Sequence, residues 1–142
     1  MKKDIFVQLR ERLDDLGISF PAVAGVDIPY LKKFFTEEHA RVFIVMEDRF
    51  QPVEELAERL GKSPDEVKTS LDAMADKGLV MTTTGIDPTF YAPLPWLTGW
   101  GDWTAYYEDK DAAELTGAYK KGFAADPTSK WARWVAHLLQ AA

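Results

Sequence analysis

The sequence predicts an α+β fold that is mostly helical, and the stretch Ser63–Leu94 carries this prediction. Its first half has the signature of one long amphipathic helix: a capping serine, proline at the first helical position, a capping-box glutamate and apolar residues at helical spacing. Its second half has two β-prone runs, residues 79–83 and 89–91, around a turn-rich gap, which is typical of a β-hairpin. A short helical pattern and a glycine turn stand directly upstream. This order of elements predicts a winged helix-turn-helix.

The N-terminal part is expected to hold two helices joined by an ordered connector. Leu9 and Leu13 belong to an apolar stripe at helical spacing within residues 4–16, and Gly17 can end that helix. The connector that follows contains glycine and proline but is too apolar for a free linker, so we expect it to pack along the domain. Residues 29–35 then predict a short helix.

The middle of the chain supplies the helices that precede the long one. Thr36 is expected to cap a helix over residues 37–48, because two glutamates in its first turn complement the helix dipole. Residues 49–51 predict a short extended segment. Pro52 then begins a compact helix over residues 53–60.

The sequence changes character after the hairpin. All five tryptophans lie between Trp96 and Trp134. Residues 104–123 predict one helix, or two helices broken near Asp111. Residues 130–139 predict a terminal helix with one apolar face.

These patterns predict a winged helix-turn-helix with an N-terminal helix and a C-terminal helical extension, divided into two domains. Residues 1–95 form the winged-helix domain, which includes the N-terminal helix and the connector. Residues 96–142 form an aromatic-rich helical extension packed on that domain.

Composition limits the chemistry that the chain can perform. Its 142 residues suffice for one ordinary domain with a core, and no cysteine is present. Disulfides, cysteine nucleophiles and cysteine-ligated iron–sulfur clusters are therefore excluded within this chain. The sequence has neither a long apolar run nor a secretory signal, so we expect a cytoplasmic protein without membrane contact. The net charge of −6 opposes nucleic-acid binding unless a local basic patch exists.

The charges of the long helix and the hairpin decide whether such a basic patch is expected. Acidic residues outnumber lysines among the positions that we expect to be exposed, and the hairpin over residues 79–91 has no lysine or arginine. DNA binding is therefore the less favoured alternative, because a recognition helix needs donors and cations. If DNA is bound, most plausibly by a dimer, the contacts are expected to come from residues on and before the long helix: Arg59, Lys62, Lys68, Thr69 and Ser70.

The aromatic and terminal segments have two interpretations. Their large rings are spaced so that they share helical faces, which favours packing inside the chain but also suits a docking surface for a protein partner. The residues that would form such a surface are Trp96, Trp100, Trp103, Trp131, Trp134 and Leu138.

Catalytic patterns are weak, so we expect a protein that is not an enzyme and that holds no metal or other cofactor. His39 and His137 are the only histidines, and no metal-spaced carboxylates accompany them. We expect His39 on the exposed side of its helix. The paired carboxylates stand at predicted helix ends or exposed faces, where solvated charge is the default.

Three stretches carry a resemblance to a known family: Phe20–Asp27, Leu31–Ala40 and Met74–Val80. With the strand over residues 90–94, they resemble the N-terminal winged-helix module that precedes the 4Fe-4S ferredoxin domain in ferredoxin-like proteins of anaerobic bacteria and archaea. The resemblance covers roughly residues 1–125. The cluster-binding cysteines of that family are absent here, so electron transfer is assigned to no residue of this chain.

The resemblance implies a non-catalytic interaction or regulatory module associated with an iron–sulfur, ferredoxin-type redox protein. Its expected partner is an adjacent 4Fe-4S ferredoxin domain or a separate protein, and a homodimer is also possible. The alternative is a DNA-binding transcriptional regulator of the winged helix-turn-helix type. A third, less favoured hypothesis is an enzyme with a pocket in the aromatic connector.

Overall fold

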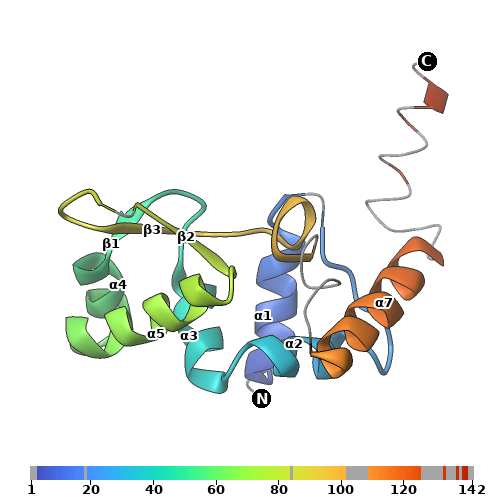
Figure 1. Cartoon of the computed structure of the whole chain (residues 1–142), viewed down its shortest axis with the longest axis horizontal. Helices are drawn as coiled ribbons and strands as arrows, with labels where there is room; N and C mark the ends of the chain where they lie inside the picture. Colours follow the sequence, from blue (N-terminus) through green and yellow to red (C-terminus); the bar gives the residue numbers. More distant parts are fainter. Residues whose placement is uncertain are drawn as a thin grey trace. The chain divides into compact units, whose positions relative to one another are not determined.

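The computed structural model describes residues 3–17, 19–83, 85–101 and 109–125, together with residues 133, 137, 139 and 140. The described chain is α+β and mostly helical, with a three-stranded antiparallel sheet (Figure 1), which confirms the coarse fold class. Among the helices of these residues, none has the length and apolar composition needed to cross a membrane.

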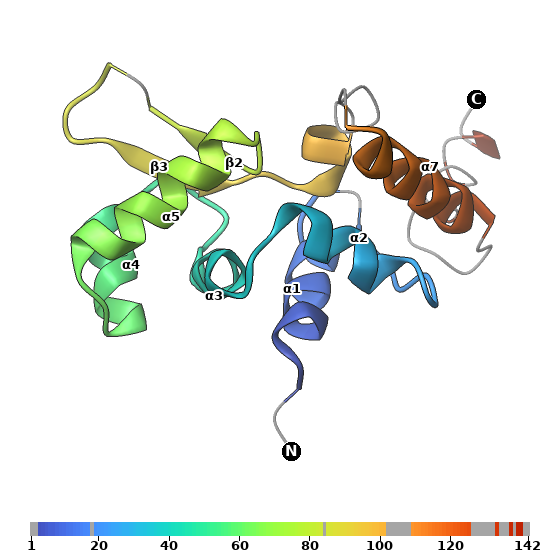
Figure 2. The same cartoon turned by 60° about the horizontal axis from the view of Figure 1, so that its bottom comes forward.

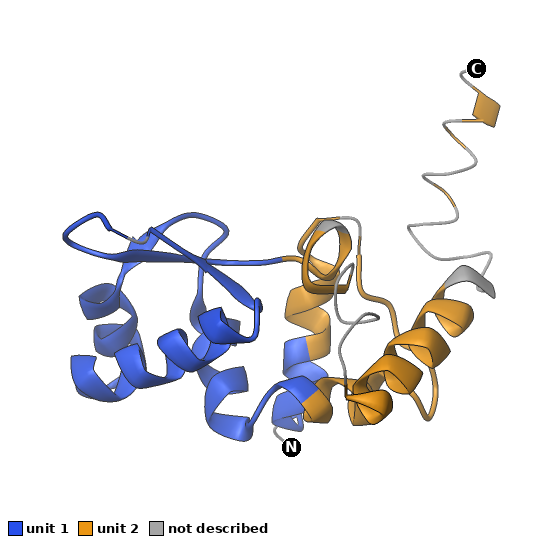
Figure 3. Ribbon diagram, viewed as in Figure 1, with its two compact units in different colours: residues 1–9, 34–94 blue, residues 10–33, 95–142 orange. Residues whose placement is uncertain are grey.

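The chain divides into two compact units (Figure 3). Unit 1 comprises residues 1–9 and 34–94, and unit 2 comprises residues 10–33 and 95–142. One boundary between the units follows residue 94, whereas the predicted domains meet after residue 95, and residues 10–33 belong to unit 2. The physical reason is that this connector supplies aromatic rings to the core of unit 2. The predicted packing of the extension on the first domain stays a prediction.

The helices of unit 1 are α3 (Glu37–Val45), α4 (Val53–Leu60) and α5 (Pro64–Asp76), with the first residues of α1 (Ile5–Asp14). All four lie within the ranges that sequence periodicity predicts. Helix α3 ends earlier than the predicted residue 48, because the backbone is already extended at its C-cap, where φ is −70° and ψ is 133°.

The caps of these helices follow the predicted chemistry. Thr36 Oγ1 accepts a hydrogen bond of 3.1 Å from the His39 N–H at the start of α3. Ser63 Oγ accepts one of 3.3 Å from the Glu66 N–H at the start of α5. Gly61 ends α4 with a φ of 64°, a left-handed conformation in which glycine has no steric cost. Together these caps fix the short turn between α4 and α5.

The sheet of unit 1 has the strand order β1-β3-β2 and is antiparallel throughout. Its strands are β1 (Gln51–Pro52), β2 (Val80–Thr82) and β3 (Phe90–Pro93). The predicted hairpin is present, whereas the strand before α4 shares only Gln51 with the extended segment predicted over residues 49–51. Helices α4 and α5 lie to one side of the β2–β3 hairpin (Figure 2). Side chains alternate between the two faces of a sheet. On this sheet the buried Gln51 pairs with the buried Tyr91.

The core of unit 1 lies between the three helices and the inner face of the sheet. Phe35 and Phe43 meet edge to face at 5.4 Å between ring centroids. Other buried side chains of this core come from α3, α4, α5, the residue before β2 and strand β3, namely Val42, Leu56, Val67, Leu71, Met74, Leu79 and Tyr91.

Unit 2 is built around an aromatic core. Its elements are α2 (Asp27–Phe34), the π-helix η1 (Trp96–Trp100), α7 (Lys110–Ala125) and the second half of α1. Phe20 stacks on Tyr119 with ring centroids 4.3 Å apart. The indole of Trp96 meets Tyr119 edge to face at 4.8 Å. Helix α7 overlaps the predicted helix 104–123, whereas residues 102–108 and most of 130–139 lie outside the described residues.

Three described glycines of unit 2, Gly17, Gly101 and Gly122, stand where a side chain has no room. A Cβ atom on Gly101 would overlap the indole of Trp96, and a Cβ atom on Gly122 would overlap a γ-methyl group of Val23. Glycine at these positions therefore allows the aromatic core and the connector to pack closely.

Candidate functional site

Helix α5 and the hairpin form the surface on which the sequence places possible DNA contacts. On this surface Lys68 Nζ lies 2.6 Å from Asp72 Oδ2, one helical turn along α5. The other oxygen of Asp72 accepts a hydrogen bond of 2.5 Å from the hydroxyl of Tyr91 on β3. The only cation in the middle of α5 is therefore already paired with a carboxylate that is itself held by the sheet.

The pKa values within this triad shift as the contacts require. The hydrogen bond to Asp72 is the main cause that raises the pKa of Lys68. Burial pushes the pKa of Asp72 upward, but the hydrogen bonds from Lys68 and Tyr91 outweigh it and bring that pKa below its usual value. Burial, followed by the hydrogen bond to Asp72, raises the pKa of Tyr91. At neutral pH the triad is an ammonium, a carboxylate and a neutral phenol.

The two polar residues that follow Lys68 are, respectively, bonded to their own helix and buried. Thr69 Oγ1 donates a hydrogen bond of 2.9 Å to the Asp65 carbonyl of its own helix. Ser70 is only 5% exposed, so the expectation that it lies on the exposed face is wrong. Ser70 lies three residues after Val67 and four before Met74, which places it on the apolar face of α5.

The basic residues ahead of α5 have acidic partners as well. Lys62 Nζ lies 3.5 Å from Glu38 Oε1. Arg59 Nη2 lies 2.7 Å from Glu47 Oε1, and its Nη1 donates a hydrogen bond of 3.1 Å to the carbonyl of Val45 at the end of α3. Each predicted cationic contact is thus neutralised by a carboxylate of the same unit.

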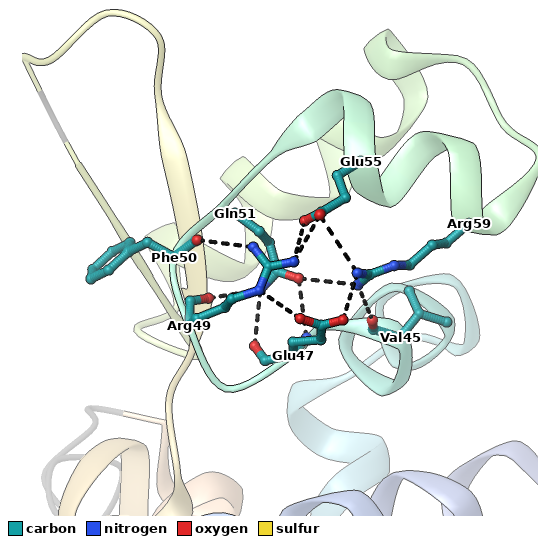
Figure 4. Close-up of polar contacts among 7 residues, drawn as sticks. All are labelled: Val45, Glu47, Arg49, Phe50, Gln51, Glu55 and Arg59. Atoms are coloured by element: carbon teal, nitrogen blue, oxygen red, sulfur yellow. Dashed lines mark hydrogen bonds and ion pairs between the residues drawn. The ribbon is translucent and has the colours of Figure 1, made fainter.

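Arg59 belongs to a larger polar cluster at the start of β1 (Figure 4). Arg49 binds both carboxylate oxygens of Glu55, at 2.7 and 2.8 Å, and its Nε lies 2.5 Å from Glu47. These bonds to Glu55 and Glu47 raise the pKa of Arg49. Arg59 Nη2 also lies 3.6 Å from Glu55 Oε1, so the two guanidinium groups share Glu47 and Glu55. The cluster thereby joins the segment after α3 to α4.

Gln51 connects this cluster to the backbone and is completely buried, and its amide oxygen accepts a hydrogen bond of 3.4 Å from Arg59 Nη1. Its amide nitrogen donates to the carbonyls of Glu47 and Arg49, at 2.9 and 2.8 Å. Its amide oxygen accepts from the Glu47 N–H at 3.1 Å. The sequence analysis missed this role, and the only signal was a polar residue in an otherwise β-prone position.

A hollow of about 390 Å³ lies between α5 and the inner side of the hairpin. Its lining includes the Lys68–Asp72–Tyr91 triad, Asp76 from the last turn of α5 and Thr82 from β2. Asp76 is exposed and forms no ion pair or hydrogen bond with any described residue. The hollow therefore has an excess of negative charge.

The partner-docking prediction fails for two of its residues. Trp96 and Trp100 are both fully buried in the aromatic core of unit 2, so they cannot form a docking surface, and the alternative of internal packing is correct for them. The indole N–H of Trp96 donates a hydrogen bond of 3.0 Å to the hydroxyl of Tyr30. The other predicted docking residues, Trp103, Trp131, Trp134 and Leu138, lie outside the described residues.

His39 is less exposed than its helical position predicts. Its Nδ1 atom is buried and has no hydrogen-bond partner among the described residues. Burial, with a smaller contribution from the charge of Lys77, lowers the pKa of His39, so the ring is neutral at pH 7. Within the part of the chain that the structure describes, no three His, Asp or Glu residues are grouped so that they could hold a metal ion.

Comparisons with models of known protein families, with curated proteins and with solved structures found no match to this chain.

Proposed function

We propose that this chain is a non-catalytic winged-helix module that binds a protein partner, in association with an iron–sulfur, ferredoxin-type redox protein. The observation that carries the proposal is the state of the predicted DNA-contact residues. All of those on α5 and before it are paired with carboxylates, bonded to their own helix or buried. At these predicted DNA-contact residues, the proposed winged helix therefore lacks cations that are free to bind phosphate.

The winged-helix part of the proposal rests on element order. Helix α3, strand β1, helices α4 and α5, and the β2–β3 hairpin follow one another, and β1 pairs with the hairpin strand β3. In such a module the second helix of the turn carries recognition and the hairpin is the wing. This order is also what favours the alternative function, a DNA-binding regulator.

Electrostatics favour the protein partner over DNA. Phosphate contacts supply most of the affinity of DNA-binding proteins, and each one requires a cation that can exchange for counterions. If Lys68 bound a phosphate, its ion pair with Asp72 would break. The Asp72 carboxylate would then repel the nearby phosphate, which opposes DNA binding. Protein interfaces do not carry this requirement, because their cores are depleted of charge.

The link to an iron–sulfur protein rests on the family resemblance of Phe20–Asp27, Leu31–Ala40 and Met74–Val80. A module of this kind without cysteines would position or regulate a cluster-bearing domain, on the same or another chain. Such a role fits a cytoplasmic location, where cysteine-ligated clusters remain reduced and assembled.

The first test measures DNA binding by a mobility-shift titration with mixed genomic DNA at several salt concentrations. We expect no binding at physiological salt and only weak, sequence-independent binding at low salt. Tight and sequence-selective binding would contradict the proposal and favour the regulator.

A pair of matched variants shows whether the carboxylates are the reason. In the double variant Glu38→Gln and Asp72→Asn, Lys62 and Lys68 lose their acidic partners, so affinity for DNA at low salt should rise. The slope of log affinity against log salt should steepen by about one to two units, roughly one for each freed cation. The control Glu11→Gln with Asp15→Asn removes the same charge from the N-terminal region and should change the slope less.

The second test concerns the partner. The chain purified in a native complex should carry iron and acid-labile sulfide, supplied by a cysteine-rich partner, with the visible absorption of a cluster. A native complex that contains a partner but no iron would remove the redox association and leave only the interaction module.

A further inference from the structure

The outer face of the three-stranded sheet is the one that points away from α4 and α5 (Figure 2). Paired residues of neighbouring strands share a face, and side chains alternate between the two faces along each strand. Tyr91 lies on the inner face, because its hydroxyl bonds to Asp72 of α5, and Gln51 pairs with it there. The alternate positions therefore form the outer face: Phe50, Pro52, Met81, Thr83, Phe90 and Ala92.

One row of this outer face crosses all three strands. Met81 of β2 pairs with Ala92 of β3. On the other side of β3, Pro52 pairs with Phe90, and the same register continued by one residue places Phe50 beside Ala92. Figure 4 shows the ring of Phe50 directed away from the polar cluster at the start of β1. The row thus has a large apolar side chain at each end and a small one at its centre.

The two ends of this row are exposed although both side chains are apolar. Phe50 is 47% exposed and Met81 is 39% exposed, whereas Ala92 between them is buried. Pro52 and Phe90, in the next row toward the hairpin tip, are partly exposed. None of the residues of the outer face is charged. Apolar side chains that gather on one exposed face mark an interaction surface, whereas single ones need no explanation.

We propose that the outer face of the sheet joins two copies of this chain around a two-fold axis parallel to β3. In this arrangement Phe50 of each copy packs against Met81 of the other, and the two Ala92 residues lie at the centre. Every contact then occurs twice, as in any isologous dimer. The inference goes beyond the proposed function and depends neither on a redox partner nor on DNA.

The strand order explains why this axis suits the face. Strands β1 and β2 flank β3, so a two-fold axis parallel to β3 brings β1 of one copy over β2 of the other. The aromatic end of the row in one copy then meets the thioether end of the row in the other, which is a favourable contact. Sheets that pack face to face also keep their strands nearly aligned.

Charge favours contact between copies at this face over the helices of the same unit. The net charge of −6 makes two copies repel one another in most orientations. Helices α4 and α5 each begin with two acidic residues, Glu54 and Glu55 or Asp65 and Glu66, so contact through them would oppose like charges. The only charged residue in the hairpin over residues 79–91 is Asp87, exposed near its tip. Salt screens repulsion between such exposed groups, so self-association should strengthen as salt is added.

Self-association is tested by sedimentation equilibrium of the full chain at rising protein concentration and at two salt concentrations. We expect a reversible equilibrium between monomer and dimer at high micromolar concentration. The dimer should be weak, because six residues per copy are fewer than the roughly 20–30 of a standard interface. It should be tighter at the higher salt concentration. A chain that stays monomeric at about 1 mM would overturn the inference and leave the face for a protein of another kind.

Two charge variants test the two-fold pairing. Phe50→Lys and Met81→Glu each place a charge against an apolar side chain of the other copy, so each should weaken dimerisation at least about tenfold. Mixed in equal amounts, they can form a heterodimer in which the new lysine meets the new glutamate, so the mixture should associate more tightly than either variant alone. Ala118→Lys, at an exposed position of α7, is the control and should leave dimerisation unchanged. Circular dichroism shows whether each variant is folded.

Three further results would overturn the inference: a dimer that Phe50→Lys and Met81→Glu leave unchanged, a mixture that associates no better than its components, and equal weakening by the control Ala118→Lys. The first and third would place the contact between copies elsewhere, and the second would mean that Phe50 and Met81 do not meet across the axis. Each of these leaves the proposed function standing, because that function is decided by the DNA titration and by iron in the native complex.

Discussion

At the scale of single residues, Gln51 is the clearest case of a buried polar side chain with a structural role. Its amide satisfies two backbone carbonyls and one N–H of the turn between α3 and β1, where no regular secondary structure could do so. Buried backbone groups need such partners. The neighbouring ion pairs of Arg49 and Arg59 lie at partly exposed positions, where each contributes little to stability.

Replacing the buried amide is expected to be costly. Gln51→Leu keeps a similar volume but removes the partners of the Arg49 carbonyl and the Glu47 N–H, whereas the Glu47 carbonyl keeps its bond from the Arg49 N–H. The free energy of unfolding should therefore fall by about 2–4 kcal/mol. Urea denaturation followed by circular dichroism measures the loss. Gln8→Leu is the control, because the exposed amide of Gln8 donates only to the Lys3 carbonyl, and it should change stability by less than about 0.5 kcal/mol. Equal losses in the two variants would contradict this role.

The hydroxyl of Tyr91 is expected to contribute to the free energy of unfolding in a way that depends on pH. Tyr91→Phe removes the hydrogen bond to Asp72 and should lower stability at pH 7 by about 0.5–1.5 kcal/mol. The folded-state pKa of Asp72 lies below its usual 3.8, so its ionised form contributes stability above that pH and loses it as the pH falls through the folded value. The difference between wild type and variant should therefore narrow at acidic pH, as urea denaturation along a pH series would reveal. A difference that stayed constant would mean that Asp72 is not involved.

At the scale of elements, the sequence predicts the helices well and their contacts poorly. The caps at Thr36 and Ser63 were predictable because capping depends on neighbouring residues. The burial of Ser70 was also predictable, since its spacing from Val67 and Met74 places it on the apolar face. The ion pairs of Arg59 and Lys62 were not predictable, because their partners Glu47 and Glu38 are distant in sequence.

The N-cap of α5 allows a test of how much one capping side chain contributes to the stability of the protein. Ser63→Ala removes the acceptor for the Glu66 N–H and should lower the free energy of unfolding by about 1 kcal/mol. Ser63→Asp restores an acceptor and adds a favourable charge at the helix N-terminus, so it should regain most of the loss. Thermal denaturation compares the three proteins. No difference between alanine and aspartate would indicate that this cap is not limiting.

At the scale of the whole molecule, the chain crosses between its two units within helices. Helix α1 has residues 5–9 in unit 1 and residues 10–14 in unit 2, and α2 ends across the same boundary. Sequence patterns could not reveal this, because periodicity identifies a helix but not the core to which each turn belongs. The role of Phe20 and Tyr30 in the core of unit 2 depends on contacts with rings about 90 residues away, such as Tyr119.

Shared helices predict coupled unfolding. Leu56 is fully buried in unit 1, and Leu56→Ala should cost about 2–5 kcal/mol. Trp96 and Trp100 are fully buried in unit 2, and the sequence of unit 1 has no tryptophan, so a change in fluorescence follows unit 2, whereas circular dichroism follows both units. Because α1 has residues 5–9 in unit 1 and residues 10–14 in unit 2, unfolding of either unit would break this helix, and we expect both signals to shift to the same lower urea midpoint. A fluorescence midpoint that does not move would show that the units unfold independently.

The contact between Gly101 and the indole of Trp96 has an evolutionary consequence. No larger residue fits at position 101 while tryptophan occupies position 96, so the two positions are expected to change together among descendants of the same ancestor. Gly122 and Val23 make a second such pair. Distant homologues could therefore be recognised by joint substitution at these paired positions even after overall identity has been lost.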